Sequence, residues 1–398
     1  MVTECKIVIG ANYGDEGKGL ATRYFTLKAK KEGKSVLNVL FNGGCQRGHT
    51  ADFPNGTRHI FHHFGSGTFD GADTYFASKF IVNPMEFVRE GEEIRKEMGQ
   101  FPRCFISPSC RVSTPYDMII NRIVEESRGE DRHGSCGLGI WETTQRLYQM
   151  QFGDIDAPYD YLRFEQMAAL SDRAFTDLMF WISHEYLPAR LKQYGISDIP
   201  EPYEKIIESH VTARNYLVDF RVVQKLCENG YHMFPPEYDA IIYEGGQGLA
   251  LSEDNRGEWP HVTASDTGAA YAIDDFSDAG DVEICYVTRP YLTRHGAGDL
   301  PGECDPKSFI LNFEEDKTNI PNPYQGELRY APLYDDMLER VMADFRKQKT
   351  TVKPSMSIFM THMNEAPDEM ADWIVACPYT KKTYLSWSKY AEEVMEVL

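Results

Sequence analysis

A glycine-rich segment near the N-terminus places the strongest constraint on this chain. Gly10–Gly19 (GANYGDEGKG) follows the apolar run Ile7–Ile9, which is typical of a buried strand, and opens a helical pattern that extends to about Lys31. Glycines between a strand and a helix let backbone N–H groups approach an anion at the positive end of the helix. The spacing is not that of the common Walker motif. We therefore predict an atypical phosphate-binding loop, with a tight surface turn as the alternative.

Two charged residues of this segment are suited to chemistry on a phosphate. Lys18 supplies a mobile cation that can reach a terminal phosphate, and Asp15 supplies a carboxylate that can hold Mg²⁺ or take a proton. The segment therefore combines a phosphate cradle, a cation and a base within one turn.

Alternating strand and helix patterns predict an α/β fold. Strand-like apolar runs occur at Lys6–Ile9, Ser35–Phe41, Arg103–Ile106, Ala240–Tyr243, Val282–Val287 and Ser357–Met360. Helical patterns occur at 19–31, 84–98, 114–127, 158–193, 203–228 and 333–347. This alternation favours a mostly parallel central β-sheet flanked by helices. We expect a single domain over residues 1–398, with a helical subdomain at about 158–228 and a flexible loop at about 304–331.

Composition excludes several classes of protein. The 398 residues carry a formal net charge of −20, and without clustered Lys and Arg a nonspecific nucleic-acid surface is not expected. The sequence contains neither a long apolar stretch nor a signal-like N-terminus, so we expect no membrane association. The nine cysteines show no CxxC spacing, which fits reduced thiols and a cytoplasmic location, in a host cell if the protein is viral.

Further polar loops rich in small residues recur along the chain. They are Asn42–Thr50, His133–Thr143, Tyr243–Gly248, Trp259–Thr263 and Thr293–Gly298. In the first of them His49 can stabilise charge on a transferring phosphoryl group, with a purely structural histidine as the alternative. Ser135 suits a second phosphate, and the amide of Gln247 can read the edge of a base. Because no hydrolase nucleophile motif or zinc motif accompanies them, these loops indicate phosphoryl chemistry on small molecules.

In this order, the loops resemble those of the adenylosuccinate synthetase family. The family carries a GDEGKGK loop, a GGxNAGHT loop, a GTTGRGIGP loop, an EGAQG turn with a YVTSSNT-like segment, and a TRVGAGPFPTE loop. The corresponding stretches here are Gly14–Leu20, Gly43–Thr50, Gly134–Trp141, Glu244–Gly248 with His261–Thr267, and Thr293–Glu303. The resemblance runs from residue 6 to about 303 and weakly to 365.

The resemblance implies a ligase that joins L-aspartate to C6 of a purine nucleoside monophosphate, after a nucleoside triphosphate has phosphorylated the 6-oxygen. By matched position, Asp15 would take the N1 proton and His49 would stabilise the moving phosphoryl group. Mg²⁺ would be held by Asp15 and the Gly48 carbonyl. The triphosphate site would comprise Asn12, Gly14, Glu16, Gly17, Lys18, Gly19, Gly48 and Thr50, with His362 and Asn364 at the donor base. The acceptor and aspartate would be bound by Gln46, Ser135, Cys136, Arg146, Gln247, Thr263, Arg294 and Arg329. The family usually forms homodimers.

Departures from the family pattern bear on the substrates. The family's TKLD becomes Thr361–Asn364, and Asn364 cannot accept two hydrogen bonds from guanine as Asp does. We therefore expect weakened selectivity for GTP and use of ATP as the phosphoryl donor, with GTP as the alternative. The arginine-rich loop that touches aspartate and ribose is nearly lost around Arg329. This mixture resembles the family's viral branch, which acts on dGMP and leads to 2-aminoadenine DNA. IMP is the alternative acceptor. Other possible classes are a nucleotide kinase or GTPase-like switch, and a noncatalytic nucleotide sensor.

Overall fold

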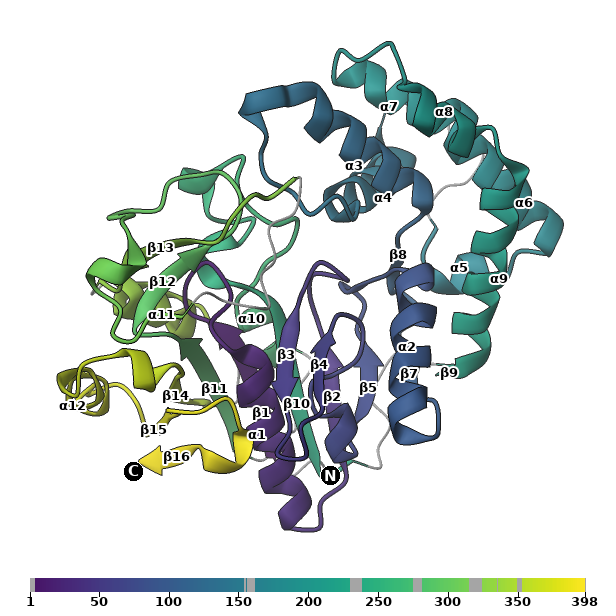
Figure 1. The fold of residues 1–398 in the computed structure, drawn as a ribbon. Helices are drawn as coiled ribbons and strands as arrows, with labels where there is room; N and C mark the ends of the chain where they lie inside the picture. The colour runs from purple at the N-terminus through teal and green to yellow at the C-terminus, as the bar shows by residue number, and fades with distance from the viewer. Residues whose placement is uncertain are drawn as a thin grey trace.

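A mostly parallel β-sheet forms the centre of the computed structural model, which describes residues 4–153, 155, 162–229, 238–274, 281–314, 324–334, 336–348 and 353–397 (Figure 1). In this described part the sheet has ten strands, in the order β16 (Met395–Val397), β15 (Lys382–Leu385), β14 (Ser355–Met360), β11 (Asp281–Thr288), β1 (Glu4–Gly10), β10 (Ala240–Gly248), β2 (Val36–Leu40), β5 (Asp73–Phe76), β7 (Cys104–Ile106) and β9 (Cys227–Asn229). Neighbouring strands are parallel except β15 and β16, which pair antiparallel. The predicted mostly parallel α/β fold is confirmed.

The described helices pack on both faces of this sheet and beyond its β9 edge. They are α1 (Lys18–Lys31), α2 (Pro84–Met98), α3 (Pro115–Arg128), α4 (Ile140–Phe152), α5 (Phe164–Ala168), α6 (Asp172–Trp181), α7 (Leu187–Gln193), α8 (Glu201–Ile207), α9 (His210–Leu226), α10 (Ala270–Asp274), α11 (Asp336–Arg346) and α12 (Glu369–Val375). Successive residues of β1 point to opposite faces: Val8 packs with Phe25 of α1, whereas Ile7 packs with the cluster that contains Met337 of α11. Burial on both faces explains why the central strands are continuously apolar.

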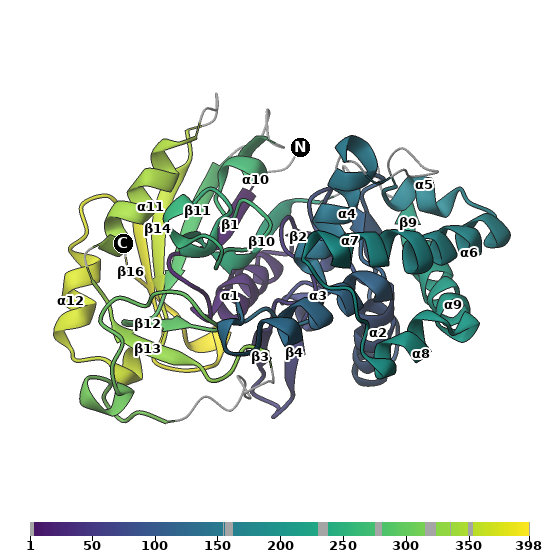
Figure 2. The same ribbon diagram turned by 90° about the horizontal axis from the view of Figure 1, so that it is seen from above.

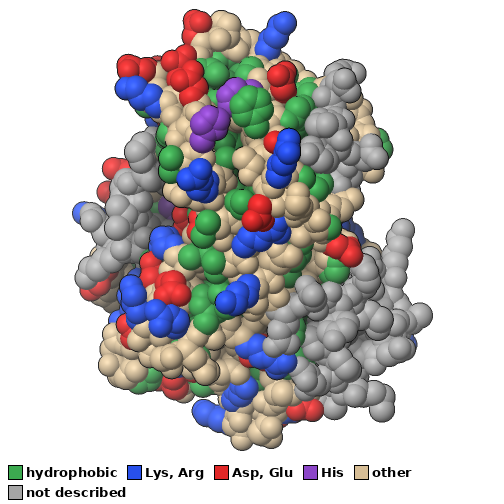
Figure 3. All heavy atoms as spheres, turned by 90° about the vertical axis from the view of Figure 1, so that its right-hand side faces the viewer, with side chains coloured by type: hydrophobic (Ala, Val, Ile, Leu, Met, Phe, Trp, Pro, Cys, Tyr) green, Lys and Arg blue, Asp and Glu red, His purple; other side chains and the backbone are tan. Residues whose placement is uncertain are grey.

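The region between α5 and α9 packs beyond the β7 and β9 edge of the sheet, opposite the edge near α12 (Figures 1 and 2). Its buried residues, such as Phe175 and Phe220, belong to the same hydrophobic cluster as Phe76 of β5 and Ile106 of β7. On the described part of its outer face, charged side chains of both signs lie among small groups of hydrophobic ones (Figure 3). This is the pattern of amphipathic helices that turn one side to the core.

The structure corrects several sequence predictions of secondary structure. The helical pattern at 203–228 ends in a short strand, β9, which pairs with β7 at the sheet edge. The expected strands omitted β5, β15 and β16, which are only three or four residues long. The loop expected at about 304–331 includes the start of β13 (Arg329–Pro332), and its residues 315–323 lie outside the described residues, as do 158–161 of the helical subdomain.

Three pairs of short strands complete the described fold. They are β3 (His49–Asp52) with β4 (Arg58–Phe61), β6 (Ile81–Val82) with β8 (Arg111–Val112), and β12 (Tyr291–Arg294) with β13. β3 follows the predicted glycine loop that starts at Asn42, and β12 leads into the predicted loop that ends at Gly298. Both strands therefore carry site residues to the carboxyl end of the sheet. None of the helices in the described part of the chain combines the length and apolarity that a membrane crossing requires.

Candidate active site

The predicted phosphate loop connects the end of β1 to the start of α1. Gly14, Asp15 and Gly17 all have positive φ angles, of 121°, 60° and 95°, so the backbone between the strand and the helix folds into a tight curl. Gly17 is the N-cap of α1 and provides no side-chain cap, which leaves the first turn of the helix open to an anion. A side chain at Gly17 would also collide with Thr361, since an added Cβ would lie 2.7 Å from its methyl group.

The carboxylate of Glu16 turns inward and organises this loop. It is 2% exposed, accepts hydrogen bonds from the backbone N–H groups of Asn12 (2.9 Å) and Gly14 (3.1 Å), and pairs with Lys18 Nζ at 3.0 Å. Gly10 makes room for it, because a Cβ there would stand 2.3 Å from Glu16 Oε2. Glu16, expected to bind the triphosphate, therefore also holds the loop and the lysine in place.

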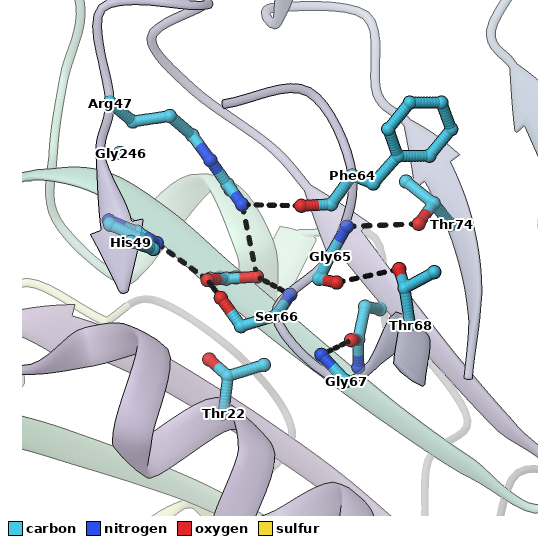
Figure 4. Close-up of polar contacts among 12 residues, drawn as sticks. Thr22, Arg47, His49, Phe64, Gly65, Ser66, Gly67, Thr68, Thr74 and Gly246 are labelled. Atoms are coloured by element: carbon cyan, nitrogen blue, oxygen red, sulfur yellow. Dashed lines mark hydrogen bonds and ion pairs between the residues drawn. The ribbon is translucent and has the colours of Figure 1, made fainter. Parts of the chain in front are cut away.

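His49 belongs to a buried polar network. The carboxylate on which His49, Arg47 and Ser66 converge in Figure 4 is that of Glu244, in the middle of β10. His49 Nδ1 lies 2.5 Å from Glu244 Oε1, Ser66 N donates to Oε2 at 3.0 Å, and Arg47 approaches Oε2 at 3.4 Å. With Nδ1–H donated to Glu244, Nε2 is the nitrogen left for a ligand.

Opposing effects set the charges of this network. Burial raises the pKa of Glu244, but Arg47, His49 and Ser66 outweigh it and bring the pKa down to about 2. Burial and the charge of Arg47 lower the pKa of His49 to about 4, although Glu244 opposes them. Glu244 is thus a fixed anion, and His49 is neutral near pH 7 until an anionic ligand favours its protonation.

One large cavity, of about 1300 Å³, brings most of the predicted site residues together. From the sequence prediction it is lined by Gly14, Asp15, Glu16, Gly17, Lys18, Gly19, Gln46, Gly48, His49, Thr50, Ser135, Cys136, Gln247, Thr263, His362 and Asn364. Gly19 lets β3 approach α1, because a Cβ there would lie 3.1 Å from the Cβ of His49. Both amide atoms of the Gln46 side chain are buried without a hydrogen-bond partner. Buried polar atoms of this kind on a cavity wall are typical of a ligand contact.

A second acidic residue organises the loop that precedes α4. Glu125 of α3 accepts hydrogen bonds from Gly134 N (3.0 Å) and Ser135 N (3.4 Å), and Asn121 donates to Ser135 Oγ at 2.7 Å. Ser135 and Cys136 therefore face the cavity from a loop that is already braced from behind.

Four predicted binding residues do not line this cavity. Asn12 is held by Thr288 and Arg340. Arg146 is fully buried, where it makes an ion pair with Asp117 at 2.9 Å and donates to the carbonyl of Val112. Its role here is to hold α4 against α3, which corrects its expected contact with the monophosphate.

The two arginines expected at aspartate are also engaged elsewhere. Arg294 is 1% exposed and pairs with Glu258 at 2.6 Å. Arg329 pairs with Glu303 at 2.7 Å and donates to the carbonyl of Gly298.

Sequence reasoning assigned no role to several residues that line the cavity or lie directly behind its wall. Glu244 lies in the predicted turn Tyr243–Gly248 but was given no role there; its buried carboxylate with a lowered pKa is a signal of function that only the folded chain reveals. His295 lies in the predicted loop Thr293–Gly298, and its Nε2 lies 3.4 Å from Asp15 Oδ2. Trp387 and Lys389 line the cavity from the segment after β15, which contains no recognisable motif.

The cavity wall offers donors suited to Mg²⁺. The Asp15 carboxylate and the backbone of Gly48 both line the cavity, and they are hard oxygen donors. No group of three or more His, Cys, Asp or Glu in the described residues forms an all-protein metal site. A single carboxylate with one carbonyl fits Mg²⁺, which typically keeps water molecules and is bound partly by substrate phosphates.

Together these features define the class of the protein, an α/β fold with a glycine-rich strand–loop–helix unit, open to an anion, at the carboxyl end of a parallel sheet. The family model described as adenylosuccinate synthetase matches residues 7–320. The chain therefore belongs to the adenylosuccinate synthetase family.

Individual relatives agree with this assignment. The chain is 28% identical over 309 residues to adenylosuccinate synthetase of Mesoplasma florum, and 28% over 314 residues to that of Saccharophagus degradans, in each case over 75% of this chain. The alignments span 64% and 65% of those relatives, so about a third of each curated protein has no counterpart in the match.

Two solved structures share the fold. Fully ligated adenylosuccinate synthetase from Plasmodium falciparum aligns with a TM-score of 0.59 and 17% identity, covering 98% of this chain and 86% of that one. Cyanophage S-2L succinoaminodeoxyadenylate synthetase (PurZ), bound to dGMP and dATP as an energy donor, aligns with a TM-score of 0.61 and 16% identity, covering 99% and 95%.

Proposed function

We propose that this protein is a ligase that joins L-aspartate to C6 of a purine nucleoside 5′-monophosphate, driven by a nucleoside triphosphate. The observation that carries the proposal is the meeting of Asp15, Lys18 and His49 with Gln46 and Ser135 in one cavity. The first three suit phosphoryl transfer, and the last two suit an acceptor with a phosphate of its own. Family membership supports the same reading.

The first step needs a base beside the purine ring. Asp15 takes the proton from N1, so that the 6-oxygen becomes an oxyanion and attacks the γ-phosphorus, while the bond from that phosphorus to the β-phosphate oxygen breaks. His49, protonated in the presence of the triphosphate, donates from Nε2 to the transferring group, and Glu244 compensates its charge. When bound to Asp15 and the Gly48 carbonyl, Mg²⁺ supplies countercharge to the phosphate oxygens.

In the second step the amine of aspartate attacks C6 and the phosphate leaves with the original 6-oxygen. Arg329 is the better candidate for the aspartate carboxylates, because its pair with Glu303 is partly exposed and costs little to exchange. Arg294 pairs with Glu258 in a buried setting, where removing the partner is costly. Arg329 is therefore the proposed contact of the aspartate carboxylates, without help from Arg294.

The donor base is proposed to be adenine. His362 and Asn364 line the cavity next to Trp387, and Thr361 joins this segment to the phosphate loop by donating to the Glu16 carbonyl at 2.8 Å. An amide at Asn364 cannot accept both guanine donors, whereas an aromatic ring stacks on either purine. The partners are thus a monophosphate, L-aspartate and ATP, in an enzyme proposed to be a homodimer.

The proposed acceptor is dGMP, with N6-succino-2-amino-2′-deoxyadenylate as the product, and IMP is the second candidate. The Asp15 carboxylate can accept from both N1–H and the 2-amino group of guanine. The fold shared with a synthetase whose structure is bound to dGMP and dATP supports this choice. IMP is favoured by the curated relatives, which are named adenylosuccinate synthetases.

The test is an end-point assay with L-aspartate, ATP and Mg²⁺, in which dGMP, GMP, IMP and dIMP are offered separately. A new absorbance of a 6-substituted aminopurine, strongest with dGMP, is the expected result, and mass spectrometry identifies the product. Phosphate release that continues without aspartate would instead indicate a kinase or GTPase-like activity.

A further inference from the structure

A histidine that the family motif lacks faces the proposed base. His295 follows β12 in the stretch that corresponds to TRVGAGPFPTE, where the family motif has valine. Its Nε2 lies 3.4 Å from Oδ2 of Asp15, and the two side chains are 22% and 21% exposed on the wall of the same cavity. An imidazole N–H is a directional donor, which valine cannot replace.

The segment around His295 is fastened to the loop that carries Asp15. Thr293 Oγ1 donates to the carbonyl of Gly14 at 2.8 Å, and Arg289 Nε donates to the carbonyl of Asp15 at 2.5 Å. Together with His295, these contacts bind two consecutive residues of the phosphate loop. Asp15 itself has a φ of 60°, a strained conformation for a residue other than glycine, so its position depends on such neighbours.

The other side of the same segment touches the acceptor loop. A Cβ added to Gly134 would lie 2.4 Å from Cα of Gly296, so these two glycines are in close backbone contact. Ser135, the proposed contact of the monophosphate, is the next residue after Gly134. The backbone of His295 is therefore fixed between the base and the acceptor site.

We propose that His295 is a positioning residue for Asp15, an inference that rests on the proposed function. Its Nε2–H donates to Oδ2 and orients the carboxylate, so that Oδ1 faces N1–H of the bound purine. A carboxylate has about four lone-pair sites, so this bond leaves capacity for the 2-amino group of guanine. Hydrogen bonds of catalytic groups often shorten in the complex with substrate, and the 3.4 Å separation is expected to do the same.

The experiment compares His295→Val and His295→Gln with the wild-type enzyme. Valine is the family residue and removes the donor, whereas the Gln side-chain amide can place an N–H where imidazole Nε2 stands. We expect His295→Val to lower kcat about 10- to 100-fold, as loss of an orienting partner typically does, with KM for the monophosphate and ATP within about twofold. His295→Gln should recover most of this loss. Calorimetric binding of dGMP should be unchanged in both variants.

His210→Val and His210→Gln are the matched controls, since His210 is exposed at the start of α9 and does not line the cavity. Equal kcat for His295→Val and the wild type, equal loss in both His295 variants, or a rise in KM without a fall in kcat would each overturn the positioning role. If the wild-type enzyme forms no product, the proposed function fails together with this inference. If it forms product and only the variants disagree, this inference alone fails.

Discussion

Replacing Glu244 by Gln tests how the buried network supports His49. The substitution keeps the size of the side chain but removes the charge that faces His49 Nδ1 at 2.5 Å. Glu244 is the group that opposes the lowering of the His49 pKa, so without it that pKa falls further below about 4 and the protonated form becomes harder to reach. A hydrogen bond to a charged group contributes about 1.5–3 kcal/mol. At about 1.4 kcal/mol per tenfold change in rate, Glu244→Gln should lower kcat roughly 10- to 150-fold.

The same substitution also affects folding, which the assay must separate from catalysis. Arg47 is buried beside Glu244 and would lose its only compensating carboxylate among the ion pairs of the described residues. Removing one member of a buried pair typically costs about 3–5 kcal/mol of unfolding free energy. Steady-state kinetics should therefore be measured at a temperature at which circular dichroism finds the variant folded.

Glu283→Gln is the matched control. Glu283 is another buried carboxylate, paired with Lys6 at 2.8 Å, and it does not line the cavity. We expect this control to lower the free energy of unfolding while kcat stays within about twofold of the wild type. A folded Glu244→Gln variant with wild-type kcat would refute the role of this carboxylate in supporting His49.

Further predictions concern the site and its surroundings. Chelation of divalent cations should abolish turnover, Mg²⁺ should restore it, and Asp15→Asn should abolish turnover while calorimetry still detects dGMP. Gln46→Met should raise KM for the monophosphate about tenfold and leave KM for ATP unchanged, because the monophosphate loses its hydrogen bond to the buried amide. Arg146→Met should lower the free energy of unfolding by about 3–5 kcal/mol, because Asp117 is left buried without its ion-pair partner, and it should leave KM unchanged. A raised KM for the monophosphate would instead support the contact with the monophosphate that the sequence predicted. Burial lowers the pKa of His63 to about 3, so as the pH falls below about 6.5 this histidine is protonated in the unfolded chain but not in the folded one. Between pH 7 and pH 5 the free energy of unfolding of the wild type should therefore fall by about 2 kcal/mol through this residue. Urea unfolding of His63→Gln should show a smaller fall over the same range.

The centre of the fold was predictable from the sequence because local signals and burial agree there. Ile7–Ile9 are apolar on both faces, and the glycines that follow are required by positive φ angles and close contacts. The edge strands were not predictable, since β9 and β16 are only three residues long and β9 depends on pairing with β7, which is distant in the sequence. β9 follows α9 without a break, so in the sequence the helical pattern of α9 masks the short strand.

The loops of the site were predictable, but the partners of their side chains were not. Lys18 and His49 reach the cavity as expected, since each lies in a glycine loop next to a strand. Arg146 was misassigned because its partner Asp117 lies on another helix, and nothing in the local sequence indicates their ion pair. The bond between His49 and Glu244 spans 195 residues, so only the folded chain brings them together.

The transfer of the purine 6-oxygen to phosphate tests the central claim most directly. The wild-type enzyme would be supplied with dGMP labelled with ¹⁸O at the 6-position, L-aspartate, ATP and Mg²⁺, and the inorganic phosphate analysed by mass spectrometry. If the oxyanion formed by Asp15 captures the γ-phosphoryl group, each phosphate released with product carries one ¹⁸O atom. Phosphate without the label, formed together with the 6-substituted product, would contradict the account.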